Sequence, residues 1–135
     1  MAKESGLGFS VAVDDAATAP QTISNDVTEL EFSTPRDIQE TTGVDVSAME
    51  RILLLADMSV KLSGVFNDES NMSHAVFKTV PSTAVPRTTT LGISGQSLAA
   101  ELLYSKYDCK RTNKGELTWE TQGDLQSGLV PTWSA

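Results

Sequence analysis

Alternation of apolar and polar residues with a period of two is the dominant pattern along this chain, and a period of two predicts β-strands. The clearest run covers residues 58–66, where every second residue belongs to one face. That face comprises Met58, Val60, Leu62, Gly64 and Phe66. The residues between them are mostly polar, so we expect a strand with one face in a core and the other in solvent.

A second alternating run, Val27–Ser33, is predicted to place Glu29 and Glu31 together on one face. Val27 is expected on that same face, and the opposite face is expected to hold Thr28, Leu30 and Phe32. Residues 88–93 form a third run of the same kind, in which Thr89, Leu91 and Ile93 alternate with Thr88, Thr90 and Gly92.

The last alternating region predicts a β-hairpin. Its first strand is expected to point Leu103, Tyr107 and Cys109 inward, with lysines and an aspartate facing out. The four residues 112–115 (TNKG) then form the turn. The second strand carries Leu117, Trp119 and Thr121 on one side.

Two stretches have helical spacing instead. Ser70–Val80 offers Ser70 and Asn71 as caps and ends before Pro81. Ser47–Ala56 begins with a capping-box pattern, so a helix is the first expectation there. Its apolar run at residues 52–55 also fits a buried strand.

Together these elements predict a mainly β fold, a sandwich or barrel with one or two short helices against it. The 135 residues suit a single domain, 1–135, that folds without disulfides. The 39% hydrophobic content fits thin layers better than a thick α/β core. A polar loop is expected at residues 14–26 and an extended C-terminal arm at residues 127–135.

The charge of the chain narrows the classes of function that the sequence allows. The net charge is −8, and residues 1–56 hold 10 acids against 3 bases. Proteins that hold nucleic acids usually have the opposite sign, because neutralising phosphates drives their affinity. We therefore expect no tight binding of DNA or RNA.

Catalytic and metal-binding patterns are weak in this sequence. His74 is the sole histidine and Cys109 the sole cysteine, and no Gly-x-Ser-x-Gly elbow is present. The acidic run at residues 67–71 lacks the spacing of a calcium loop. We expect no enzymatic activity, no cofactor and no metal.

The first residues lack a signal-peptide pattern, and the longest apolar run, 52–56, is too short to cross a membrane. The expectation is a soluble protein made in a cytoplasm, with no membrane partner.

The order of motifs resembles that of the major tail proteins, or tail tube proteins, of siphophages, particularly those of actinobacterial phages. The resemblance starts with residues 23–32 (ISNDVTELEF) and continues through Thr41-Thr42-Gly43. Leu62-Ser63-Gly64 leads to residues 66–68 (FND), and a short helix around residues 73–77 follows. A threonine-rich strand and a closing hairpin, with its Leu117-Thr118-Trp119, complete the match.

This resemblance implies a small β-sandwich or barrel that assembles into hexameric rings, which stack into a hollow tube in the virion tail. DNA passes through that tube without specific binding. Tape-measure, tail-tip and tail-terminator proteins are the implied partners. An acidic lumen repels DNA over about 8 Å at physiological salt. We therefore predict that strands 27–33 and 36–42 line the lumen, with the acids Glu29, Glu31, Asp37 and Glu40.

Contacts between rings are predicted in three segments, residues 14–26, 47–56 and 127–135. The candidate residues are Asp14, Asp15, Pro20, Glu50, Arg51, Pro131 and Trp133. Other readings stay open. The chain fits another tube or connector subunit, such as a type VI secretion tube-like or head–tail completion protein. It also fits a monomeric β-sandwich binding module.

Overall fold

The computed structural model describes residue 3 and residues 5–134, and its fold is mainly β, as the sequence predicted. Ten strands, one helix and one 3-10 turn make up the described chain. In order they are β1 (Ser10–Asp14), β2 (Pro20–Thr22), η1 (Ser24–Asp26), β3 (Val27–Ser33), β4 (Arg36–Glu40), β5 (Arg51–Ala56), β6 (Ser59–Val65), α1 (Ser73–Phe77), β7 (Arg87–Ile93), β8 (Gln96–Arg111), β9 (Leu117–Leu125) and β10 (Trp133–Ser134).

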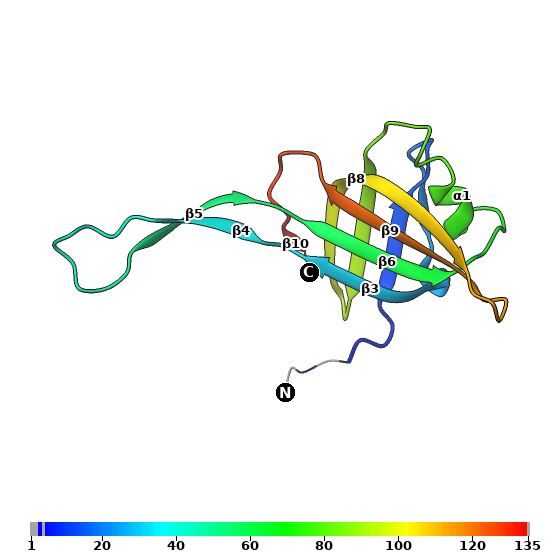
Figure 1. The fold of residues 1–135 in the computed structure, drawn as a ribbon, viewed down its shortest axis with the longest axis horizontal. Coiled ribbons are helices and arrows are strands. Elements are labelled where there is room, and N and C mark those ends of the chain that lie inside the picture. The colour runs from blue at the N-terminus through cyan, green and yellow to red at the C-terminus, as the bar shows by residue number, and fades with distance from the viewer. Residues whose placement is uncertain (1–2, 4, 135) are drawn as a thin grey trace.

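All strands except β4 and β5 belong to one antiparallel sheet with the order β2-β1-β7-β8-β9-β6-β3, and β10 adds to β8. Strand β8 spans 16 residues, pairing with β7 through its first half and with β9 through its second. The sheet folds over along β8, so that β6 and β9 cross in front of β1 and β7 (Figure 1). This is the orthogonal packing in which one strand passes from layer to layer at a bulge.

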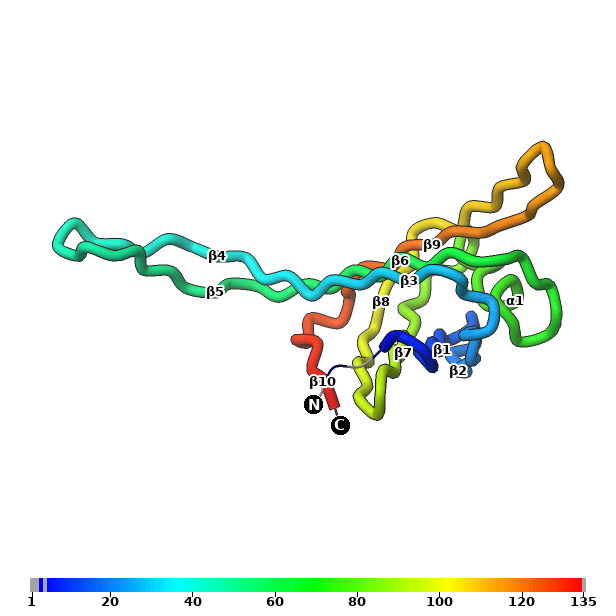
Figure 2. Tube along the Cα trace, turned by 90° about the horizontal axis from the view of Figure 1, so that it is seen from below, coloured from blue at the N-terminus to red at the C-terminus, as the bar shows by residue number. Residues whose placement is uncertain are grey.

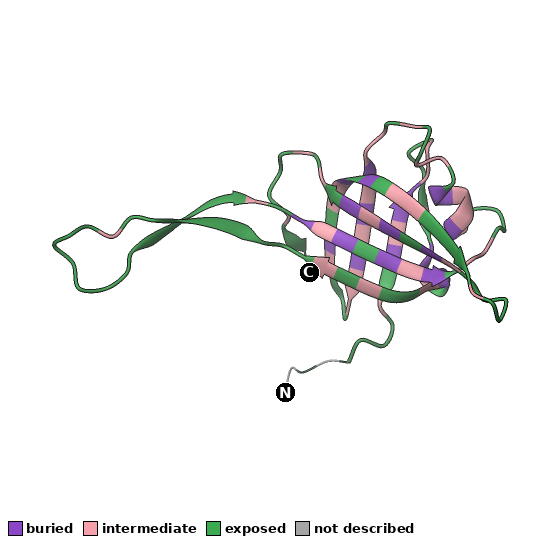
Figure 3. Cartoon of the chain, viewed as in Figure 1, coloured by how far each residue is buried: buried purple, intermediate pink, exposed green. Residues whose placement is uncertain are grey.

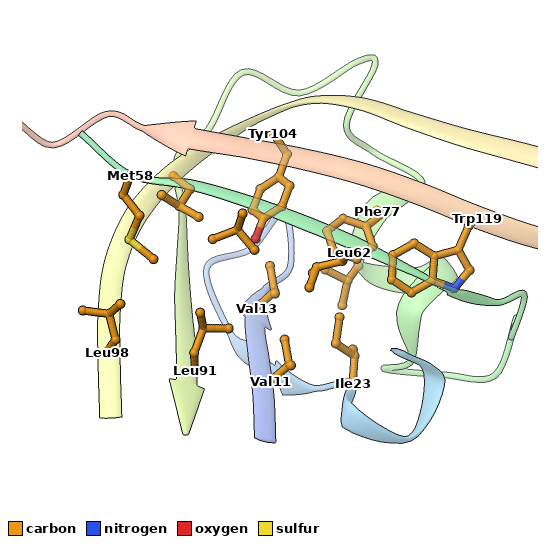
Figure 4. Close-up of a cluster of buried hydrophobic side chains, with 13 residues drawn as sticks. Val11, Val13, Ile23, Met58, Leu62, Phe77, Leu91, Leu98, Tyr104 and Trp119 are labelled. Atoms are coloured by element: carbon orange, nitrogen blue, oxygen red, sulfur yellow. The ribbon is translucent and has the colours of Figure 1, made fainter. Parts of the chain in front are cut away.

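The core lies between these two layers, and we call this part of the molecule the body. Figure 4 shows side chains from both layers meeting there. The buried apolar cluster comprises Val11, Val13, Ile23, Met58, Val60, Leu62, Val76, Phe77, Leu91, Leu98, Leu102, Tyr104 and Trp119. The alternation predicted for residues 58–64 is confirmed, because Met58, Val60 and Leu62 are buried while Lys61 is exposed.

Two bulges reverse predicted orientations. In β8 the pairing with β9 shifts between Tyr104 and Lys106, so Leu102 and Tyr104 point into the core. Leu103 is consequently 45% exposed, contrary to the prediction, whereas Tyr107 beyond the shift packs against the core as predicted. Cys109 pairs with the buried Trp119 and so lies on the predicted side, but it is exposed near the end of β8. A bulge inserts one residue and moves every later side chain to the opposite face.

In β3 a similar shift lies between Val27 and Glu29. Val27 therefore packs against the core with Leu30 and Phe32, whereas Thr28 is exposed. The predicted sides of Val27 and Thr28 were both wrong for this reason. The side predicted for Glu29 and Glu31, which lie beyond the bulge, is not affected.

Helix α1 forms where the sequence predicted a helix, but it is shorter, Ser73–Phe77. Neither Ser70 nor Asn71 caps it. The N-cap position is Met72, which makes no side-chain cap bond. The buried Asp26 carboxylate, far away in the sequence, accepts the Ser73 amide at 3.0 Å and the Asn67 side-chain amide at 2.9 Å.

The helix predicted for Ser47–Ala56 is wrong. Residues 51–56 are strand β5, which pairs with β4, and residues 47–50 are not helical. The Thr42 hydroxyl accepts the Glu50 amide at 2.9 Å and donates to its carbonyl at 3.3 Å. The Glu50 backbone therefore makes hydrogen bonds across a hairpin, and Glu50 takes no part in a capping box. The alternative of a buried strand is also wrong, because Leu53 is 59% and Leu55 is 81% exposed.

The segments predicted as a polar loop (14–26) and as an extended C-terminus (127–135) both contain regular structure. Residues 14–26 hold β2 and the 3-10 turn, and β2 pairs with β1. The C-terminal segment folds back on its own chain, where Trp133 pairs with Leu98 and lies 5.9 Å from Phe32, centroid to centroid. Ala135, the last residue of the predicted C-terminal extension (127–135), lies outside the described residues.

Candidate assembly surfaces

Three surface features stand out among the described residues: a projecting hairpin, a polar sheet face and a basic turn. The hairpin, which we call the arm, consists of residues 36–56. It extends from the body as a two-stranded ribbon, with its tip far from the core (Figures 1 and 2). It continues β3 through Pro35, and the Pro35 carbonyl accepts the Asp57 amide at 2.9 Å where the arm begins.

The arm carries apolar side chains on both faces. Antiparallel register pairs Ile38 with Leu53 and Gln39 with Ile52. Neither β4 nor β5 contains a buried residue, and Figure 3 shows the arm in the colour of exposed residues almost throughout. The exposed large apolar residues of the arm are Ile38, Val44, Val46, Met49, Ile52, Leu53, Leu54 and Leu55. An exposed apolar surface of this extent usually marks a contact with another molecule.

The polar face is the outer side of strands β3, β6, β9 and β8. Register sets two rows of side chains across it. One row runs Glu31, Lys61, Gln122, Lys106, and the next runs Glu29, Ser63, Glu120, Asp108. The Lys106 ammonium lies 3.6 Å from Glu120 and 3.7 Å from Asp108. Four acids against two lysines leave this face acidic.

The structure divides the four acids predicted for the lumen. Glu29 and Glu31 lie together on the polar face and line one shallow pocket with Lys61 and Glu120. Asp37 and Glu40 lie on β4 of the arm, outside the main sheet. The alternation of β3 identified the first pair. The sequence did not show that the chain leaves the sheet after Ser33, so the second pair was placed on the same surface.

The predicted ring contacts fall into three places. Glu50 and Arg51 lie on the arm. Pro131 and Trp133 lie in the C-terminal segment, where Pro131 lines a groove with residues of β8 such as Ala99. The third group is the turn between β1 and β2.

In that turn, the Asp15 side chain makes hydrogen bonds within the chain. The Asp15 carboxylate accepts the backbone amides of Ala17 and Ala19 at 2.9 and 3.0 Å. The bond from Ala19 is the main reason that the pKa of Asp15 lies below its ordinary value. Asp14 is 8% exposed, and Pro20 begins the edge strand β2.

The buried Arg87 links the same turn to helix α1 and the residues that follow it. The Arg87 guanidinium donates to the Asp14 carbonyl at 3.1 Å, to the Val76 carbonyl at 2.6 Å and to the Thr79 hydroxyl at 2.8 Å. Burial lowers the pKa of Arg87. Its hydrogen bonds are all internal, so we assign it to the stability of the body.

The two surface features that sequence reasoning missed are the exposed apolar arm and the basic turn between β8 and β9. The segment 47–56 was a candidate ring contact, but its apolar run was expected in a helix or a buried strand, so the projecting hairpin was missed. The turn carries Lys110, Arg111 and Lys114 within five residues, a cluster that an acidic chain makes conspicuous.

No group of three or more potential metal ligands occurs among residues 3 and 5–134. Within the same residues, no helix has the length and hydropathy needed to cross a membrane.

Comparison with known proteins shows which other proteins share this fold. No protein-family model matches the chain, and no curated protein sequence matches it significantly. Solved structures do match. A chain of the virion of a native gene transfer agent particle superposes with a TM-score of 0.77 at 16% identity, over 98% of this chain and 100% of that one.

Two further structures agree. A chain of the tail of an empty gene transfer agent particle, with C6 symmetry, gives a TM-score of 0.75 at 15% identity, covering 98% of this chain and 100% of that one. A chain of the six-fold symmetrised baseplate of the anti-feeding prophage gives 0.68 at 12% identity, covering 100% and 98%. The chain therefore has the fold of components of phage-like tail particles.

Proposed function

We propose that this protein is a structural subunit of the tail tube of a phage-like particle. Six copies close into a ring, and rings stack into a hollow tube through which DNA passes. The observation that carries the proposal is the arm, whose apolar residues lack any cover from the body. The likeness to a gene transfer agent tail with C6 symmetry supports the six-membered ring.

The arm favours self-assembly over a monomeric role. An isolated two-stranded hairpin is marginally stable in water, and it gains stability when another surface covers its apolar side chains. Leu53 and Leu55, at 59% and 81% exposed, would be buried in such a contact. A projecting element that reaches a neighbour beyond the body gives a heterologous contact, which repeats in one direction as an open filament.

Ring closure is proposed to use the edges of the main sheet. Among the described residues, β2 pairs only with β1, and β3 pairs only with β6. Unpaired strand edges are ready templates for another chain, and a closed ring removes them. The candidate contacts Asp14, Asp15 and Pro20 lie beside the β2 edge, and Trp133 lies beside the end of β3. Pro131 lies in the groove beside β8.

The polar face is proposed as the lumen lining. Its acids, Glu29 and Glu31 among them, repel the phosphates of passing DNA, and its lysines are held in ion pairs or beside acids. Asp37 and Glu40 belong to the arm, so we propose that they continue the acidic lining where one ring meets the next.

The proposal includes the setting implied by the sequence resemblance. The subunit would belong to the tail of a virion, of the siphophage type found in actinobacterial phages. It would meet tape-measure, tail-tip and tail-terminator proteins.

Electron microscopy of the purified chain tests this function. Negative-stain images over a range of concentrations should show hollow tubes or six-fold rings. A Leu53→Ser/Leu55→Ser variant should remain monomeric, because the arm would no longer gain from burial. Leu7→Ser, at a residue 90% exposed near the N-terminus, is the matched control and should assemble normally. A wild-type chain that stays monomeric at every concentration, with the arm variant indistinguishable from it, would contradict the proposal.

A second candidate is a connector or baseplate subunit, which the likeness to the anti-feeding prophage baseplate favours. Such a subunit forms one ring or a few rings rather than a tube. The same images separate the two, because isolated six-fold rings that never stack would favour the connector. A monomeric binding module is the outcome in which neither rings nor tubes form.

A further inference from the structure

The turn between β8 and β9 is the most basic part of the molecule. Lys110, Arg111 and Lys114 are three of the 10 basic residues in a chain of net charge −8, and all three are exposed. Among the described residues, the ion pairs involve only Lys106. We call residues 109–117 the basic tip. Its turn is held by the Thr112 amide donating to the Glu116 carbonyl and the Gly115 amide donating to the Thr112 carbonyl, both at 3.0 Å.

The arm has the opposite charge overall, because its four acids outnumber its two bases, Arg36 and Arg51. Between residues 37 and 50 the chain has four acids and no base. These acids are Asp37, Glu40, Asp45 and Glu50. All four are exposed, and no ion pair involves them in the part of the chain that the structure describes.

These two charged ends are opposite extensions of the same sheet layer. The register aligns Ser33, Ser59 and Asp124 at the end where the arm leaves. It aligns Gly64, Trp119 and Cys109 at the other end, where the basic tip leaves. Figures 1 and 2 both show the arm and the basic tip on opposite sides of the body. Moving a second copy along the strand direction therefore brings the arm of one copy toward the basic tip of the next.

We propose that the arm of one subunit docks on the basic tip of a second copy of this chain in the next ring, and that this charge pairing sets the stacking direction. The proposal rests on the proposed function and names the surface that receives the arm. Apolar side chains at the receiving end add to the fit, because Val65 is 57% and Leu117 is 39% exposed there. Like charges at either end disfavour arm-to-arm and tip-to-tip contacts, so rings stack with one polarity.

The chemistry favours this partner over nucleic acid. Three cations offer few phosphate contacts, and the polar face beside the basic tip is acidic. The same chain carries a complementary surface with four acids on an arm of apolar residues. Each exposed ion pair contributes little alone, but six copies in a ring act together.

Charge reversal with mixing is the decisive experiment. A tip variant carries Lys110→Glu, Arg111→Glu and Lys114→Glu, and an arm variant carries Asp37→Lys, Glu40→Lys and Glu50→Lys. Each variant alone should need at least about tenfold more protein to form tubes, because its own arm and tip repel. An equimolar mixture should recover to within about threefold of wild type, since both contacts in an alternating stack are complementary.

A control tests whether the position of the charges matters. Lys78→Glu reverses an exposed charge at the end of helix α1, which belongs to neither surface. This variant should assemble as wild type does. Wild-type tubes that form normally while the mixture stays as impaired as its components would overturn the arm-to-tip contact and leave the tube function standing.

Zero-length cross-linking provides a test that does not require tubes. A carbodiimide joins a lysine directly to a carboxylate in contact with it, and mixing ¹⁴N and ¹⁵N protein identifies links between copies. We expect links from Lys110 or Lys114 to Glu40, Asp45 or Glu50 in mixed-isotope peptides. Links between copies that join these lysines only to acids of the body, or no such links at all, would contradict the proposal.

Binding of a short DNA duplex tests the remaining alternative, that the basic tip binds nucleic acid. The tip variant should bind duplex no differently from wild type. Loss of duplex binding in the tip variant, with assembly unchanged, would assign the basic tip to nucleic acid instead.

Discussion

The body and the arm are built from the same kind of strand, yet they differ in what covers them. Among the residues that the structure describes, the body buries 13 apolar side chains between two layers. The arm also has a registered antiparallel ladder, with one shift between Arg36 and Ile38, but its strands contain no buried residue. Leu62 and Leu53 illustrate the contrast, since they are 1% and 59% exposed on neighbouring parts of one continuous ribbon. Strand pairing alone therefore does not indicate where the core ends.

The difference assigns separate roles to the two parts. Hydrophobic burial is the main favourable contribution to folding, and it is concentrated in the body. The arm receives little of it until another molecule covers its apolar residues. A chain built in this way folds around its own core and leaves an apolar element exposed, which the proposed assembly would cover.

Hydrogen exchange should show the largest contrast between the two. In the free subunit, kept dilute enough to prevent assembly, backbone amides of β6 and β9 should exchange about a thousandfold or more slowly than those of β4 and β5. The arm amides should become protected on assembly, while those of β6 and β9 change little. Strong protection of the arm in the dilute monomer would show that it needs no partner.

Paired leucine truncations give the next largest effect. Leu62→Ala should lower the free energy of unfolding by about 2–5 kcal/mol, because it leaves a cavity in the core. Leu53→Ala on the arm should change it by less than about 0.5 kcal/mol. Urea unfolding of the dilute monomer, followed by tryptophan fluorescence of the buried Trp119, measures both. Equal losses in the two variants would mean that the arm belongs to the folding core.

The sequence predicts well those elements whose pattern reflects a local physical cause. The bounds of Val27–Ser33 agree with the structure, as does the turn at residues 112–115, where Gly115 has a φ of +95°. The inward residues Met58, Val60 and Leu62 also follow from alternation alone. These features depend on side-chain periodicity and turn chemistry, which a short stretch of sequence contains.

The errors share a different cause, because each depends on tertiary geometry. A bulge near Ser105 lets β8 pass between layers, and no glycine or proline marks it in the sequence. The Ile52–Leu55 run is apolar on both faces, so it lacks the alternation that distinguishes a strand from a helix. Its exposure could not be predicted, since contiguous apolar residues normally indicate a core. For the same reason the candidate lumen acids divided between two surfaces.

Paired arginine substitutions provide a smaller contrast. Arg87→Met leaves the buried Val76 and Asp14 carbonyls without the guanidinium, and should lower the free energy of unfolding by about 1–3 kcal/mol. Arg36 donates two hydrogen bonds to the Leu54 carbonyl on the exposed arm, at 2.7 and 3.1 Å. Water replaces those bonds, so Arg36→Met should change stability by less than about 0.5 kcal/mol. Urea midpoints of the two variants at one pH give the comparison, and a larger loss for Arg36→Met would reverse the roles assigned to the two regions.

The smallest expected effect concerns pH and the turn between β1 and β2. Two backbone amides hold the pKa of Asp15 below the ordinary 3.8. A carboxyl whose pKa is lower in the folded state stabilises the fold above its unfolded pKa, and it loses that contribution as pH falls through the folded pKa. Asp15→Asn should therefore cost under about 1 kcal/mol at pH 7, since the site is only partly buried and the amide oxygen still accepts hydrogen bonds.

The difference between wild type and Asp15→Asn should shrink as the pH falls below about 4. Asp45→Asn on the arm is the control, because no hydrogen bond to the Asp45 carboxylate is found among the described residues. Its stability should follow wild type at every pH. Thermal unfolding of the dilute monomer between pH 2.5 and 7 follows all three proteins. A difference for Asp15→Asn that grows on acidification would mean that Asp15 is held in its neutral form, opposite to the assignment made from its two amide partners.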